Sequence, residues 1–142
     1  LDGIIVPDLP VEESGPLKEL CKASNIHLIP LLAPTSTDRR IAQACEQASA
    51  FIYFVSVTGV TGARQQLASD LPEMVGRIRS HTDLPVIVGF GVSRPEHVQA
   101  IGRVAEGAVV ASALLDSIDK SPHDQILQTA REFIRNLKSR EN

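Results

Sequence analysis

Stretches of consecutive apolar residues alternate along the chain with longer stretches in which apolar residues recur every three or four positions. The consecutive stretches have the length and composition of buried strands, and they lie at residues 3–6, 26–32, 51–56, 85–88 and 107–110. The stretches that follow them have the period of amphipathic helices. A strand followed by a helix, five times over, predicts a parallel sheet with the helices packed outside it.

Residues that start or interrupt these elements agree with that pattern. Pro30 lies inside the second strand, where its missing N–H suits a sheet edge or a bulge. Helix starts are expected at residues that cap helices, namely Ser14 with Pro16, Ser36 or Thr37, Ser69, Ser93 with Pro95, and Ser121. The helical faces that we expect to be buried include Leu20 with Cys21, Ile41 with Cys45, Leu71 with Ile78, and Leu127 with Ile134.

The size of the repeating unit narrows the fold class. Each strand–helix unit takes roughly thirty residues, which is one-eighth of the ~250 residues of a (βα)8 barrel. Five units do not close such a barrel. We therefore expect an α/β fold of the TIM-barrel family, an incomplete barrel with residues 1–142 in a single domain. The alternative is a complete, open five-stranded sheet, but no segment remains to cover the edge of its first strand.

The first residues of the chain point the same way. Leu1, Asp2 and Gly3 lead directly into the first strand, without Met or a signal peptide, and we expect the chain to be a piece of a longer one. The first strand would then have an unpaired edge, and the face that lines a barrel interior would be exposed. We therefore expect a chain that self-associates or aggregates.

Composition argues against several classes of partner. A net charge of -3 and a pI near 5.8 speak against nucleic acid or an anionic membrane. No apolar run reaches the roughly 18 residues of a membrane span. Cys21 and Cys45 lie in apolar helical patterns, which indicates packed thiols in a reducing, cytoplasmic setting. The four histidines are scattered without ligand spacing, so no metal site is expected.

Three loops that follow strands carry the candidate chemistry. Residues 57–63 are mostly small or hydroxylated, and residues 89–91 read Gly-Phe-Gly. Glycines admit a ligand close to the backbone, and hydroxyls bond to it. Ala111 and Ser112 begin a short helix expected at 111–117, where free N–H groups and the helix dipole favour an anion. Because parallel strands end at one edge of a sheet, the three loops together predict a phosphate site.

Three stretches of the sequence together resemble the tryptophan synthase alpha subunit. They are VPDLPVEES, VTGVTGAR after FIYFVS, and GFGVSRPEHV, in that order along the chain, and the resemblance runs over nearly the whole chain. The resemblance implies strands four to eight of a (βα)8 barrel, in a lyase of tryptophan biosynthesis that cleaves indole-3-glycerol phosphate to indole and glyceraldehyde 3-phosphate. It also implies a beta subunit, in an alpha2-beta2 assembly, that joins indole to serine with its own pyridoxal phosphate. No cofactor is then expected in this chain, and the implied location is the cytoplasm, or a plastid in a plant.

The resemblance also implies which residues bind the phosphate end of the substrate. Thr61 and Gly62 would lie on the loop that closes over the substrate. Gly91 and Ser112 would donate to the phosphate. The family commonly has glycine at the position of Ala111, whose N–H remains but whose added methyl would crowd the phosphate.

The same resemblance implies an indole-binding wall and a contact with the partner. Phe90, Ile5 and Leu31 would wall the indole, and Tyr53 would stand beside the reacting end. The alternative for Tyr53 is a half-buried core tyrosine whose hydroxyl is satisfied. The stretch Ala33–Asp38 resembles the one that meets the beta subunit.

The two acid–base carboxylates of the family lie on and just after its second strand, upstream of Leu1, so this sequence has neither. One protonates at the indole C3 side and the other accepts the indole N–H proton, work that is typically worth about 10²–10⁴-fold. Asp8 ends the first strand and either substitutes for one of them or, as we favour, holds loops by accepting backbone N–H bonds. Arg64 either screens the phosphate or, as we favour, is solvated.

Three functions remain open from the sequence. The first is part of an indole-3-glycerol phosphate lyase that is inactive as an isolated chain. The second is another phosphate-binding TIM-barrel enzyme, such as an isomerase of the same pathway, against which the VTGVTGAR loop speaks. The third is a non-catalytic chain that binds only phosphate or the beta subunit.

Overall fold

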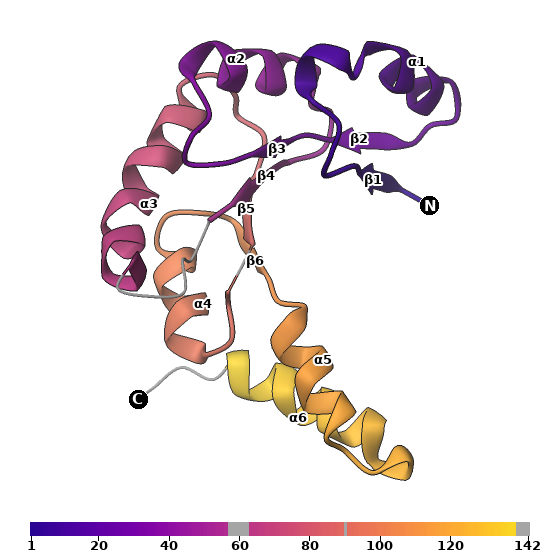
Figure 1. Ribbon diagram of the computed structural model, residues 1–142, viewed down its shortest axis with the longest axis vertical. Helices are drawn as coiled ribbons and strands as arrows, with labels where there is room; N and C mark the ends of the chain where they lie inside the picture. Colours follow the sequence, from indigo (N-terminus) through magenta and orange to yellow (C-terminus); the bar gives the residue numbers. More distant parts are fainter. Residues whose placement is uncertain (57–62, 90, 139–142) are drawn as a thin grey trace.

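The computed structural model describes residues 1–56, 63–89 and 91–138 of the chain (Figure 1). Its strands are β1 (Gly3–Ile5), β2 (His27–Ile29), β3 (Leu31–Leu32), β4 (Ile52–Val55), β5 (Val86–Gly89) and β6 (Gly107–Val109). Its α-helices are α1 (Gly15–Ala23), α2 (Asp38–Gln47), α3 (Ala63–Arg79), α4 (Pro95–Gly102), α5 (Ser112–Asp119) and α6 (Ile126–Lys138). Short 3-10 helices η1 (Val11–Glu13) and η2 (His123–Gln125) precede α1 and α6. Strands therefore form in all five predicted segments.

Every strand pair in the described residues is parallel, and neighbouring strands follow one another in the sequence. β1 pairs with β2, and β3, β4, β5 and β6 form a sheet in that order. Pro30 has no N–H to donate, so the predicted second strand is split into β2, which pairs with β1, and β3, which pairs with β4. Strand order without reversal is that of a (βα)8 barrel, whereas doubly wound sheets reverse at a switch point.

One face of the sheet forms the hydrophobic core. Ile52 and Phe54 of β4 alternate with neighbours on the opposite face of the sheet, as do Val86 and Val88 of β5, and each of the four is at most 1% exposed. They belong to one cluster with apolar residues of α2, α3 and α4. These helices lie on the same side of the strands (Figure 1). Burial on this face fixes the register of the strands, because a shift by one residue would turn the apolar side chains away from the helices.

The opposite face of the sheet is only partly covered. Tyr53, Val55 and Ile87, which lie between the core residues, are all partly exposed, as predicted for the interior face of an unclosed barrel. A methyl group on Gly89 would overlap the phenol hydroxyl of Tyr53. The Tyr53 ring therefore lies over the backbone of β5, and only glycine leaves room for it there.

Three predicted helix starts are wrong. Ser121 does not begin the last helix, because Pro122 is the N-cap residue of the 3-10 helix η2 and α6 begins only at Ile126. α3 begins at Ala63, so Ser69 lies inside the helix, because the alanine, arginine, glutamine and leucine residues at its beginning all favour helix. α4 follows Arg94 as its N-cap residue rather than Ser93, with Pro95 at the first helical position, where a missing N–H costs nothing.

Three apolar residues that the helical pattern predicts to be buried are exposed. They are Leu20 of α1, at 67%, and Leu127 and Ile134 of α6, at 84% and 40%. The helices form, but in the described chain these three side chains lie outside the packed parts of α1 and α6. Periodicity identifies the apolar side of a helix and does not say what covers it. Cys21 and Cys45 are buried free thiols, as predicted.

We predict that Gly89→Ala destabilises the chain by about 1–3 kcal/mol, because the added methyl displaces the Tyr53 phenol. Urea unfolding of Gly89→Ala, Tyr53→Ala and the double variant measures this contact. The double variant should lose less stability than the sum of the two single variants, because removal of the ring makes room for the methyl. Strictly additive losses would contradict the contact.

We also predict that the 142-residue chain self-associates in solution. In the described residues, β1 and β6 each have a single neighbouring strand, and their other edges carry unpaired N–H and C=O groups. Sedimentation velocity at increasing protein concentration should show a rising sedimentation coefficient. A monodisperse monomer that unfolds in one cooperative transition would overturn this expectation.

Candidate functional site

In the part of the chain that the structure describes, two of the hollows lie at the carboxyl ends of the strands. The first, which we name the β5–β6 hollow, has a volume of about 330 Å³. Its lining residues come from the ends of β4, β5 and β6 and the start of α5, and they are Tyr53, Gly91, Val92, Val109, Ala111 and Ser112. Ligands of α/β folds with parallel strands bind at this edge of the sheet.

The backbone at the β5–β6 hollow takes its shape from glycine and from a helix start. Gly91 has a φ of 69°, in the left-handed region that other residues rarely adopt, and Val92 follows it into the core at 5% exposure. α5 begins at Ser112, one residue later than predicted, with Ala111 as its N-cap residue and no acidic side chain in the first turn. The first N–H groups of the helix are thus available to an anion, and the helix dipole favours one.

Tyr53 supplies the polar side chain at the base of the same hollow. Its side chain leans from β4 over Gly89 of β5, toward the end of the sheet where α5 begins. Burial raises the pKa of the Tyr53 hydroxyl above its usual value near 10. The phenol is therefore neutral at physiological pH, and it can donate a hydrogen bond or form an uncharged wall.

The second hollow, the β1–β3 hollow, has a volume of about 320 Å³ and lies at the ends of β1, β3 and β4. It is lined by the loop after β1, which carries Asp8, by the loop after β3, and by Leu31 and Val55. No residue that lines this hollow also lines the β5–β6 hollow. Asp8 and Tyr53 therefore face different spaces in the described structure.

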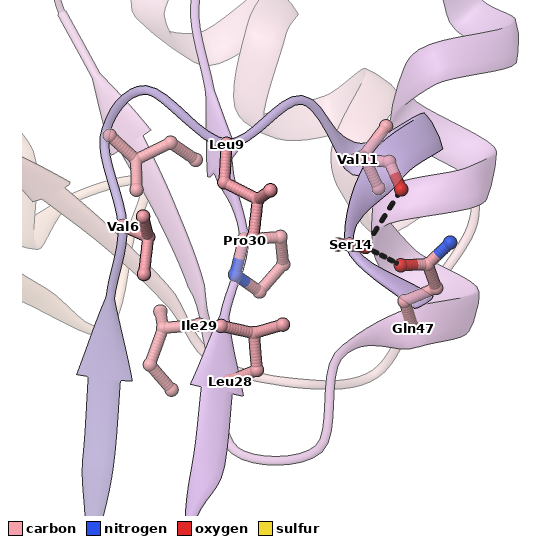
Figure 2. A pocket seen from close by; sticks show the side chains of 9 residues that line it. Val6, Leu9, Val11, Ser14, Leu28, Ile29, Pro30 and Gln47 are labelled. Carbon is pink, nitrogen blue, oxygen red and sulfur yellow. Dashed lines mark hydrogen bonds between the residues drawn. The ribbon is translucent and has the colours of Figure 1, made fainter. Parts of the chain in front are cut away.

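Beneath the loop after β1 lies a small third cavity of about 30 Å³, room for about one water molecule (Figure 2). The hydroxyl of Ser14, which is 4% exposed, donates to the Val11 carbonyl at 2.7 Å and contacts the side-chain amide of Gln47. Leu28 and Ile29 of β2 provide much of the apolar lining. The Ser14 contacts link η1 to the end of α2 beside the cavity, which is too small for a substrate.

The predicted site residues are therefore divided among several places. Tyr53, Gly91, Ala111 and Ser112 meet in the β5–β6 hollow, and Leu31 lines the β1–β3 hollow. Ile5 is 39% exposed on β1 and lines neither. The remaining predicted residues, together with the side chain of Arg64, lie outside the described part of the chain; they are Thr61, Gly62 and Phe90.

Sequence reasoning missed three residues of interest. Val92 and Val109 form the apolar part of the β5–β6 hollow. The available signal was their position in the sequence, since Val92 directly follows Gly91 and Val109 lies two residues before Ala111. Arg77 of α3 bonds to the loop Ala33–Asp38, which the sequence predicts to meet a partner. Nothing in the sequence indicates that pairing, because the two partners are about forty positions apart.

No group of three or more His, Cys, Asp or Glu side chains in the described residues has the arrangement to hold a metal ion. No helix in the same residues is long and apolar enough to cross a membrane.

The sequence and fold match known proteins along the whole chain. The family model of the tryptophan synthase alpha chain matches residues 1–142. The tryptophan synthase alpha chain of Chloroflexus aurantiacus is 46% identical over 138 residues, which are 97% of this chain and 52% of that protein. The tryptophan synthase alpha subunit of Campylobacter jejuni superposes with a TM-score of 0.82 at 32% identity, over 94% of this chain and 54% of that one.

A structure of the tryptophan synthase a2b2 complex from Pyrococcus furiosus also superposes with a TM-score of 0.82, at 32% identity, over 96% of this chain and 55% of that one. The chain thus spans about half the length of the relatives it matches, which confirms the predicted incomplete barrel. The resemblance on which the sequence prediction was based is confirmed as well. The chain belongs to the tryptophan synthase alpha chain family.

Proposed function

We propose that this chain forms the phosphate-binding part of a lyase that cleaves indole-3-glycerol phosphate to indole and glyceraldehyde 3-phosphate. The observation that carries the proposal is the β5–β6 hollow, where the left-handed backbone at Gly91 meets the first turn of α5. A phosphate monoester has a charge of about −1.5 to −2 at pH 7. The N–H groups of that first turn and the Ser112 hydroxyl are suitable donors for its oxygens.

The lining of the β5–β6 hollow favours a phosphate ester over free phosphate. Val92 and Val109 are apolar, and Tyr53 adds an aromatic ring with a neutral hydroxyl. A volume of about 330 Å³ reaches the lower end of the ~300–1,000 Å³ that small-molecule sites typically occupy. One end of the hollow therefore suits an anion and the other suits a carbon skeleton, the two parts of the proposed substrate.

The remaining substrate contacts stay predictions. We propose Ile5, Leu31 and Phe90 as the wall of the indole and Thr61 with Gly62 as the loop beside the phosphate. Leu31 lies at the end of the partly covered sheet face, where a closed barrel would enclose it.

We further propose that these 142 residues bind the substrate without turning it over when they are isolated. The reaction needs a general acid and a general base, and the resemblance implies that the family's carboxylates for this work come from positions before these 142 residues. Asp8, the one carboxylate that the sequence offered as a substitute, lines the β1–β3 hollow and not the hollow that holds Tyr53. Asp8 is therefore better suited to hold the loop after β1 than to exchange protons with the substrate.

The partner that we propose is the beta subunit of tryptophan synthase, bound at the loop Ala33–Asp38. The a2b2 complex of Pyrococcus furiosus, which this chain resembles over about half of the superposed subunit, supports such an assembly. Pyridoxal phosphate would belong to that partner, and this chain would need no cofactor. We propose a cytoplasmic location for the assembly.

We predict that Ser112→Asp weakens the binding of indole-3-glycerol phosphate by at least about tenfold. The new carboxylate would lie at the first turn of α5 and would repel the negatively charged phosphate of the substrate. Isothermal titration calorimetry of the chain with indole-3-glycerol phosphate measures this effect. Unphosphorylated indole-3-glycerol should bind weakly to both proteins and show little difference between them.

Ser24→Asp is the matched control. Ser24 is exposed at the end of α1, so this variant gains the same charge far from the carboxyl ends of the strands. Its affinity for indole-3-glycerol phosphate should equal that of the unmodified chain. Equal affinities of Ser112→Asp and the unmodified chain, or no binding by the unmodified chain, would overturn the proposed phosphate site.

A further inference from the structure

The loop Ala33–Asp38 between β3 and α2 is held first by its own hydrogen bonds. Ser36, which is 7% exposed, donates its N–H to the Ala33 carbonyl at 2.9 Å, and its hydroxyl accepts the Ala33 N–H at 3.0 Å. Thr37 caps α2, because its hydroxyl accepts the Arg40 N–H at 3.3 Å. These bonds define a tight turn, but they do not fix its orientation against the rest of the fold.

Arg77, near the end of α3, contacts this loop from outside. Its Nη2 donates to the Ser36 carbonyl at 3.2 Å and to Asp38 Oδ1 at 2.6 Å, and its Nε donates to the same carboxylate oxygen at 3.1 Å. Its Nη1 lies 3.0 Å from Met74 Sδ, one turn earlier on α3. The rigid guanidinium group thus joins α3 to two residues of the loop, Ser36 and Asp38.

The charges at this contact are balanced. Asp38 is the first residue of α2, where a carboxylate complements the helix dipole, and the cation of Arg77 lies beside it. The Asp38 side chain is 78% exposed, and an ion pair so exposed contributes little on its own. The bond to the Ser36 carbonyl matters more, because Ser36 is buried and an unpaired buried carbonyl is costly.

The same loop forms one wall of the β1–β3 hollow, through Ala33, Thr35 and Ser36. Its orientation therefore decides the shape of the surface at this end of the sheet. A partner that binds this surface would bind more tightly if the loop were already in place, since it would not have to order the loop.

We propose that Arg77 is a positioning residue that holds Ala33–Asp38 in the orientation recognised by the beta subunit. The inference rests on the proposed function, because that function makes the loop a partner surface. Arg77 does not touch the β5–β6 hollow and has no role there.

Arg77→Met tests the proposal, because methionine keeps much of the apolar stem and removes every N–H donor. The matched control is Arg79→Met, two positions further on the same helix. Arg79 forms an ion pair with Glu106, whose carboxylate also accepts the Val86 N–H at 2.8 Å, and it therefore acts at another part of the fold. Both substitutions remove one arginine and one ion pair from α3.

Hydrogen–deuterium exchange of the two variants gives the first readout, which does not depend on any ligand. Amides of residues 35–38 should exchange faster in Arg77→Met than in the unmodified chain, and at an unchanged rate in Arg79→Met. Arg77→Lys should lie in between, because one ammonium group cannot bond to the Ser36 carbonyl and Asp38 with the same fork. Equal exchange in all four proteins would overturn the positioning role.

The second readout is the affinity for the tryptophan synthase beta subunit of the same organism, measured by calorimetry. Arg77→Met should bind roughly five- to tenfold more weakly, as expected for the loss of about one net hydrogen bond, while Arg79→Met should bind normally. Equal weakening in both variants, or none in either, would overturn the inference. No binding by the unmodified chain would instead contradict the proposed partner, and the exchange experiment would still decide whether Arg77 holds the loop.

Discussion

Packing of one face of the parallel sheet beneath α2, α3 and α4 is the constraint on which the other features of the molecule depend. Phe54, Val86 and Val88 are almost fully buried there, and together with their neighbours they account for most of the core. Because side chains alternate along a strand, burial of these residues turns Tyr53 and Ile87 to the opposite face. Because the strands are parallel, it also brings the loops after them to one edge.

The candidate site follows from this arrangement with few additional requirements. Gly89 leaves space for the ring of Tyr53, and Gly91 turns the chain through a conformation that suits glycine. α5 then starts shortly after β6 ends, so its first residue and the tyrosine line the same hollow. The loop after β3 lies at the same edge but lines another hollow, and α3 holds it through Arg77. The proposed substrate site and the proposed partner surface thus lie at separate parts of one edge.

Much of the fold could be predicted from the sequence, because the signals involved are local. The apolar runs mark the strands, Pro30 marks the break in the second strand, and Thr37 marks the start of α2. The predicted start of α3 at Ser69 was wrong, because a residue type that caps helices is also tolerated inside a strongly helical stretch. The predicted burial of Leu127 was wrong as well, because helical periodicity carries no information on what covers the apolar side of a helix. The grouping of Gly91, Ala111 and Ser112 could be predicted from strand order, whereas the bond from Arg77 to Ser36 joins distant segments and could not.

In the proposed site the substrate phosphate binds between Gly91 and the first turn of α5. A crystal structure of the chain with indole-3-glycerol phosphate tests this binding mode most directly. We expect phosphate density within hydrogen-bond distance of the Ser112 N–H and hydroxyl, with the carbon skeleton directed toward Tyr53. Phosphate bound in the β1–β3 hollow, or a substrate whose phosphate faces away from α5, would contradict it.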